Sequence, residues 1–407
     1  MKSLLRLPAA WVLVYAALWF SIGLLPMVPT DLDLYFWPSA QTALAGHPLM
    51  PYAPGGQASN TNDNGPLALV PLTAVGAVVE ALGWMQNVAL RRALVQAVFS
   101  LFIVLMATEA VAAIERLRGA RLRPRSRLLT YGALLFGPPL WQSLQGYGHI
   151  EQALEVWFVL VAIRWLNRGW MVRAGIAFGL ALLCRTAAVF FVIPVLTAAW
   201  WRGPAAATRL AIAAAATGLV GLLPFYLSDP ADVTHSLAGF RGVLPVGVGS
   251  IWTFVRGTSL EGIAQHWDVA FVVAAALASN VWLATRRGGF IEERQFAGLA
   301  LTSAGFILFA KAVWPYYFME AYVFVVVWAV GRWRPSIRLA EAWFPGALIC
   351  GLGLLAEVGA TRGEPWQVLL PEAGAMFVLL TSLVLWIART GARLPPPVRG
   401  EAQVKFS

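Results

Sequence analysis

The sequence predicts an all-α integral membrane protein, a polytopic bundle of about twelve transmembrane helices. Hydrophobic residues make up 59% of the 407 residues and charged residues 12%, about half of the charged share of soluble chains. Apolar runs recur along the chain, and the lysines and arginines, which bring the net charge to +10, gather in the short loops between them. This distribution is typical of a membrane protein. It excludes nucleic acid as a partner, because it leaves no exposed basic stripe.

The apolar runs define the predicted spans. A spanning helix needs about 20 apolar residues, and the two runs on either side of Arg185 reach that length only with tilt or local thinning of the bilayer. The first run is interpreted as a retained anchor, because it is long and lacks a small-residue cleavage site. The predicted spans are 8–28, 93–113, 128–141, 150–165, 174–183, 188–200, 210–227, 269–284, 296–310, 317–330, 344–355 and 373–387.

Arginines orient this set of spans. Six of them crowd the loop 116–127, and others mark alternate loops and the tail 389–407. Lysine and arginine favour the cytoplasmic side, so we expect both termini there, in the cytoplasmic (inner) membrane. The opposite loops are poor in cations and rich in Pro, Gly, Trp and His. We expect them to face the exterior: 31–87, 142–149, 228–268, 311–316 and 357–371.

The segment 66–84 is apolar enough to span, but a crossing there would move the six-arginine loop to the exterior. We therefore expect an interfacial helix over 66–84. A shorter helix is expected over 38–45, because Pro38 suits a first helical position and Gly46 a helix end. The chain is then one transmembrane domain, 1–407, with a structured outer loop over 29–90.

Asp31 and Asp33 follow directly on the first span. An acid at the membrane edge is a candidate functional group. Two solvated acids beside a helix start would look the same in the sequence, whereas a general base would take a proton from an attacking hydroxyl. A metal site for a nucleotide sugar is disfavoured, because the pair faces away from the cytoplasm. A divalent cation stays open as a cofactor, since two carboxylates are too few to define its site.

Two patches of the sequence carry a family pattern. The first consists of Asp31-Leu32-Asp33-Leu34-Tyr35, Ala40, Leu44, Gly46, Tyr52, Gly65-Pro66-Leu67 and Pro71. The second consists of Gly148-His149-Ile150-Glu151, Arg168-Gly169, Ala174-Gly175, Gly179-Leu180-Ala181, Arg185 and Pro194. These patches resemble membrane glycosyltransferases of the GT-C fold, above all the polyprenyl-phosphate-mannose-dependent mannosyltransferases of glycosyltransferase family 87, over roughly residues 8–230. Asn64-Gly65-Pro66 departs from the family's Tyr-Pro-Pro, the His149/Glu151 pair from Gln/Asn, and Arg185 from Lys.

The resemblance implies a transferase that moves a sugar, most closely mannose, from a polyprenyl phosphate to a hydroxyl of a glycolipid or glycan acceptor at the outer face. Asp31 takes the position of the family's catalytic Asp, four residues before Tyr35, and Asp33 is the second choice. The leaving phosphate needs fixed cations, for which arginine is well suited. The expected phosphate-binding residues are Arg185, then Arg91, Arg92 and Lys311.

Further polar and aromatic residues stand at outer ends of the spans and are candidates for the substrate pocket. Structural histidines and an aromatic belt at the membrane interface would explain part of this set equally well. The candidates are Tyr35, His149, Glu151, His235, Arg241 and Tyr316.

A polytopic transporter or lipid-linked-sugar flippase is the main alternative, because carriers also have twelve helices and buried charges. A non-catalytic scaffold for envelope assembly is the third. Against a carrier, the two halves of the chain show no similarity, and the polar residues gather at outer ends rather than at the midplane. A groove from Asp31 to the lipid would favour the enzyme.

Overall fold

The computed structural model describes residues 8–52, 64–239, 244, 246, 250–286 and 289–332. Every regular element in these ranges is a helix, so the predicted all-helical class is confirmed. The predicted spans 344–355 and 373–387, the tail 389–407 and the candidate residue Arg241 lie outside the described residues.

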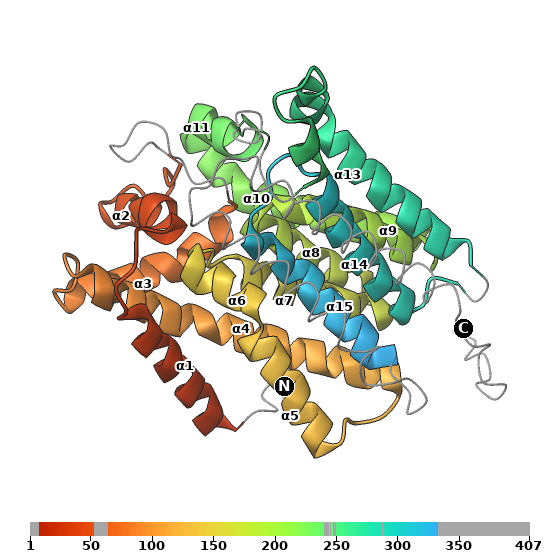
Figure 1. The fold of residues 1–407 in the computed structure, drawn as a ribbon, viewed down its shortest axis with the longest axis horizontal. Helices are drawn as coiled ribbons and strands as arrows, with labels where there is room; N and C mark the ends of the chain where they lie inside the picture. The colour runs from red at the N-terminus through yellow and green to blue at the C-terminus, as the bar shows by residue number, and fades with distance from the viewer. Residues whose placement is uncertain are drawn as a thin grey trace.

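Figure 1 shows the order of the helices along the chain. The α-helices are α1 (Ala9–Gly23), α2 (Trp37–Leu44), α3 (Leu69–Ala81), α4 (Val88–Arg118), α5 (Pro124–Phe136), α6 (Pro138–Trp141), α7 (Gln152–Asn167), α8 (Met171–Cys184), α9 (Val192–Trp200), α10 (Pro204–Ser228), α11 (Pro230–Thr234), α13 (Glu261–Ala284), α14 (Glu292–Phe309) and α15 (Phe318–Arg332). Short 3-10 or π-helical turns are η1 (Leu32–Phe36), η2 (Pro66–Ala68), η3 (Gln142–Gly146), η4 (Thr186–Phe191), η5 (His235–Gly239), η6 (Ile251–Val255) and η7 (Pro315–Tyr317).

Local sequence explains where the longest helix, α4, begins and ends. The side chain of Asn87 accepts a hydrogen bond from the Leu90 N–H at 3.1 Å, which satisfies a backbone donor of the first turn. At the other end Gly119 adopts a left-handed conformation with φ 61°, as a helix-ending glycine does. Arg116 and Arg118 lie in the last turn, where cations complement the helix dipole.

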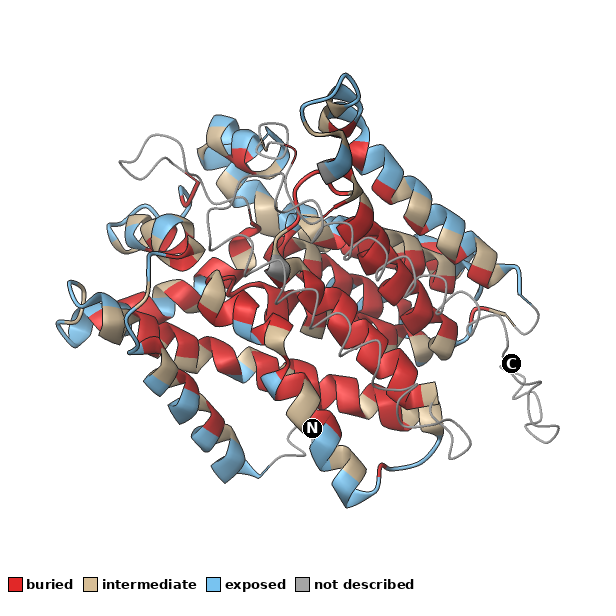
Figure 2. Cartoon of the chain, viewed as in Figure 1, coloured by how far each residue is buried: buried red, intermediate tan, exposed pale blue. Residues whose placement is uncertain are grey.

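The core lies where α4, α7, α8, α14 and α15 meet, and Figure 2 shows that α14 and α15 are almost wholly buried. In α14 all residues from Arg294 to Leu308 are buried. Helix α10 packs closely on α8, because Gly179 has no Cβ: one there would lie 2.7 Å from the Ala214 carbonyl oxygen. Small residues at such contacts are typical of helices that associate in membranes.

Three described helices are long and apolar enough to cross a membrane: α4, α10 and α13. Helix α10 buries only three of its residues, and its outward face carries apolar side chains such as Leu219 and Val220, 68% and 72% exposed. A continuous apolar outer face of this kind is suited to hydrocarbon. The protein is therefore a membrane protein, whereas the expected number of about twelve spans stays a prediction.

The outer loop expected over 29–90 contains the two expected helices. The predicted helix 38–45 corresponds to α2, and the predicted helix 66–84 to η2 followed by α3. The two pack together, with Gly76 of α3 against Leu44 and Trp37 of α2. Tyr52 donates a hydrogen bond from its hydroxyl to the Asn64 carbonyl at 2.9 Å. The interfacial placement of this loop stays a prediction.

Candidate functional site

Asp31 stands at the start of η1, at the point where the outer loop meets the segment that precedes α7. Its backbone N–H donates to the Tyr147 carbonyl at 2.9 Å. Gly148 permits this close approach, because it adopts φ +73° and a Cβ there would lie 2.8 Å from the Leu32 nitrogen. Only glycine adopts this conformation at no steric cost. The Asp31 side chain is 28% exposed and so remains accessible to a substrate.

His149 joins Asp31 to Glu151. Its Nε2 lies 2.9 Å from Asp31 Oδ2, and its Nδ1 lies 2.6 Å from Glu151 Oε1. Burial acts to lower the pKa of His149, but the charge of Glu151 and the hydrogen bond with Asp31 outweigh it and raise the pKa to about 9. At neutral pH the ring is therefore an imidazolium that donates to both carboxylates. It stacks on Tyr316, with ring centroids 3.7 Å apart.

Arg185 lies at the break between α8 and η4, with extended backbone and only 3% exposure. Its Nη1 forms an ion pair with Glu320. The Oε2 of Glu155 lies 3.8 Å from the same nitrogen, and the Oε1 of Glu151 lies 3.8 Å from Nε. Its Cζ also lies 4.6 Å from the ring centroid of Tyr317. One guanidinium thus faces three buried carboxylates, which we call the Arg185 cluster.

Four residues of this region were not among the predicted site residues: Gln152, Glu155, Tyr317 and Glu320. Gln152 Nε2 donates to Glu320 Oε1 at 3.2 Å and to the Tyr316 carbonyl at 3.1 Å, which ties α7 to the start of α15. A usable signal was present, because Glu155 and Glu320 are acids within the apolar runs 150–165 and 317–330. Ionisable residues inside a span mark functional sites by default.

Asp33 and its two arginines lie apart from this cluster. Arg91 Nη2 lies 3.0 Å from Asp33 Oδ1, and Arg92 Nη2 lies 2.6 Å from Oδ2. Burial acts to raise the pKa of Asp33, but the hydrogen bond from Arg92, the Thr30 N–H and the second arginine outweigh it and lower the pKa. Arg91 also lies over the Trp37 ring, 4.7 Å from its centroid. These contacts fasten the outer loop to α4.

The remaining predicted residues are Lys311, Tyr35 and His235. The backbone N–H of Lys311 donates to Asp268 Oδ2 at 3.0 Å, and its Nζ donates to the Gln265 carbonyl at 3.4 Å, so this buried lysine joins the loop after α14 to α13. Tyr35 is half-buried in η1. His235 is exposed at the start of η5, one residue before the buried Ser236.

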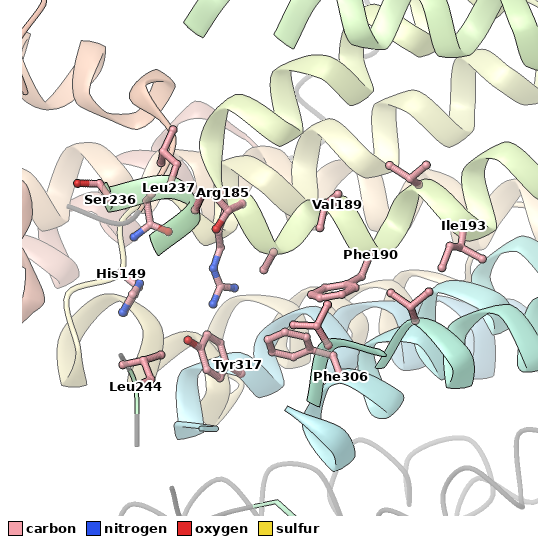
Figure 3. A pocket seen from close by; sticks show the side chains of 17 residues that line it. His149, Arg185, Val189, Phe190, Ile193, Ser236, Leu237, Leu244, Phe306 and Tyr317 are labelled. Atoms are coloured by element: carbon pink, nitrogen blue, oxygen red, sulfur yellow. The ribbon is translucent and has the colours of Figure 1, made fainter. Parts of the chain in front are cut away.

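A cavity of about 510 Å³ opens beside the cluster. Asn64, His149 and Arg185 line its polar end, and Figure 3 shows Ile193 at the opposite end, with Phe190 and Phe306 between. Further lining side chains along this apolar part are Val189, Val192, Val269 and Val273. A cation at one end and aliphatic walls at the other suit an amphiphilic anion. Arg91, Arg92 and Lys311 do not line this cavity.

Within the described ranges, no group of three or more His, Cys, Asp or Glu side chains is arranged to hold a metal ion. Asp31 and Asp33 point to different partners, His149 and the two arginines. The divalent cation that the sequence left open stays a prediction.

Among solved structures, the chain is similar to ArnT from Cupriavidus metallidurans bound to undecaprenyl phosphate. The TM-score is 0.50 and the sequence identity 14%, over 95% of this chain and 78% of that chain. No protein-family model and no curated protein sequence matches the chain. The likeness therefore establishes the GT-C fold.

Proposed function

We propose that this protein transfers a sugar from a polyprenyl-phosphate donor to an acceptor hydroxyl at the outer face of the cytoplasmic membrane. The observation that carries this proposal is the amphiphilic cavity, whose polar end holds Arg185 and reaches Asp31 through a single residue, His149. The similar fold of ArnT, solved with undecaprenyl phosphate, supports a polyprenyl-phosphate donor. Mannose is the sugar we propose, on the sequence resemblance, and a glycolipid or glycan the acceptor.

The donor would lie along the cavity with its phosphate at the polar end. Arg185 would bind the phosphate oxygens, since a guanidinium has five N–H donors and Glu320 occupies only part of them. The isoprenoid would lie against Val189, Ile193 and Phe306, the apolar walls of the cavity. As the glycosidic bond breaks, charge develops on the phosphate, and a fixed cation in a site that excludes water stabilises it.

Asp31 would act as the general base. It is 28% exposed, whereas Glu151 is fully buried, so Asp31 is the carboxylate of the pair that an acceptor reaches. The acceptor oxygen attacks the anomeric carbon, its proton passes to Asp31, and polyprenyl phosphate leaves with the electrons of the broken bond. A single displacement of this kind inverts the anomeric centre. His149 would orient the carboxylate through its hydrogen bond, and Glu151 would hold His149.

The test is turnover by the purified protein in lipid nanodiscs, with polyprenyl-phosphate-mannose as donor and envelope glycolipid extract as acceptor. Release of polyprenyl phosphate is measured for the wild type and for Asp31→Asn. Loss of a general base lowers the rate by about 10²- to 10⁴-fold, with donor binding retained. Glu80→Gln is the matched control, because Glu80 is an exposed carboxylate on α3 of the same outer loop.

Full turnover by Asp31→Asn would remove the proposed base. A wild type that binds several sugar carriers yet turns none over, with acceptor extracts of varied origin, would favour the flippase instead.

A further inference from the structure

A second hollow, distinct from the cavity at Arg185, lies between α1 and α5. We call it the α1–α5 groove; its volume is about 770 Å³. Its walls are apolar side chains of the two helices, and Val104 of α4 forms part of its floor. Several of these side chains are well exposed, including Trp11 (63%) and Leu128 (68%). The groove can therefore hold an apolar group against α4.

The two helices touch near one end of the groove. The Tyr15 hydroxyl donates to the Leu135 carbonyl at 2.7 Å, and the Tyr15 ring meets that of Phe136 edge to face at 5.5 Å. The groove therefore extends from this contact toward Pro8 at the start of α1 and Pro124 at the start of α5. Its shape suits an elongated apolar chain.

The other end is cationic. Arg127 lines the groove, and Arg123 and Arg125 are exposed at the start of α5 beside it. Among the described residues these three arginines form no ion pair within 4.0 Å, so they can bind an external anion. Arginine binds phosphate through two parallel hydrogen bonds, and a basic segment beside a membrane attracts anionic lipid.

We propose that the α1–α5 groove binds an anionic phospholipid of the cytoplasmic leaflet. An acyl chain lies between α1 and α5, and the phosphate lies at Arg127. In a bilayer an apolar groove by itself gives no preference among lipids, because lipid tails are as apolar as its walls. Selectivity therefore comes from the arginines at its open end. This site is independent of the proposed sugar transfer, because it lies on other helices than the cavity at Arg185.

Gly132 provides a sharp test of the groove. It lines the hollow, and a Cβ added there meets no atom within 4 Å. Gly132→Phe therefore starts from an unobstructed Cβ and places a ring in the space that the groove offers. Gly218→Phe is the matched control, because Gly218 also lies within a helix, α10, and a Cβ there also meets no atom within 4 Å.

Native mass spectrometry of the full chain, released from nanodiscs of equal phosphatidylglycerol and phosphatidylcholine, measures the lipid that stays bound. We expect the wild type and Gly218→Phe to retain phosphatidylglycerol in preference to phosphatidylcholine. Gly132→Phe should retain no phosphatidylglycerol. Arg127→Gln should weaken retention about fivefold, the effect of one cation at the membrane surface. Equal retention of both lipids, or unchanged retention by Gly132→Phe, overturns the proposal.

A photocrosslinking side chain at position 132 identifies the occupant directly. A crosslink to lipid supports the proposal. A crosslink to residues 1–7 or 333–407 of the chain would show that the protein itself covers the groove, and would overturn it.

Discussion

Replacing Arg185 by methionine tests the electrostatics of the site most directly. Methionine keeps much of the apolar stem of arginine and removes the guanidinium. Glu320, Glu155 and Glu151 then lose a cation that lies against all three. Arg185 and these acids are at most 5% exposed, so water does not compensate for the loss. Breaking a buried ion pair by removing one partner costs about 3–5 kcal/mol, and we expect Arg185→Met to lose that much stability.

The assay is unfolding in mixed micelles of dodecyl maltoside and dodecyl sulfate, followed by tryptophan fluorescence. Arg173→Met is the matched control, because it makes the same change at an exposed position of α8, the helix that ends just before Arg185. Exposed substitutions of this kind change stability by about 0.5 kcal/mol or less. Adding Glu320→Gln to Arg185→Met should recover part of the loss, because it removes one of the carboxylates left without a cation.

Two outcomes would refute this reasoning. One is an Arg185→Met protein within about 1 kcal/mol of the wild type, which is far below the range for a broken buried pair. The other is a double variant no more stable than Arg185→Met, which would mean that the two side chains do not interact energetically.

Two further predictions concern the contact between the outer loop and α7. The pKa of His149 rises from 6.5 to about 9 on folding. Its stabilising contribution is therefore fully present below about pH 6.5 and is lost as pH rises through about 9. The loss in the free energy of unfolding is about 3 kcal/mol. The unfolding free energy measured from pH 6 to 10 should fall by that amount in the wild type and stay level in His149→Asn. The same pH dependence in both proteins would contradict the assignment to His149. Gly148→Ala should lower both turnover and stability, because the added Cβ would meet Leu32. Gly46 also has a positive φ, +94°, but has open space around it. Gly46→Ala should therefore lower stability alone, by about 1–2 kcal/mol. Equal effects of the two alanines on turnover would contradict the role of Gly148.

The helices around Arg185 show what the sequence could predict. The expected runs 174–183 and 188–200 correspond to α8 and to η4 with α9, and the break falls at Arg185 as expected. Apolar runs and their interruptions are local properties of the chain, so they can be identified in the sequence without knowledge of the fold. The GT-C fold itself was predicted from motifs in the outer loop and in α8.

The pairing of distant residues was not predictable in the same way. Asp31 and His149 were both candidates, but 118 residues separate them, and nothing in either patch says that they meet. Their contact depends on the packing of η1 against the segment before α7, which Gly148 permits. From the sequence, Arg91 and Arg92 were expected to bind the phosphate. The structure places both on Asp33, a tertiary contact between η1 and α4.

The hydrogen bond between the Tyr52 hydroxyl and the Asn64 carbonyl has a consequence for how this protein can be altered. Residues 53–63 leave and rejoin the described structure at two points that are bonded to each other. The bond fixes the separation of the two flanks, Tyr52 and Asn64, whatever is inserted between them. Epitopes or labels inserted there should therefore leave Asp31 undisturbed.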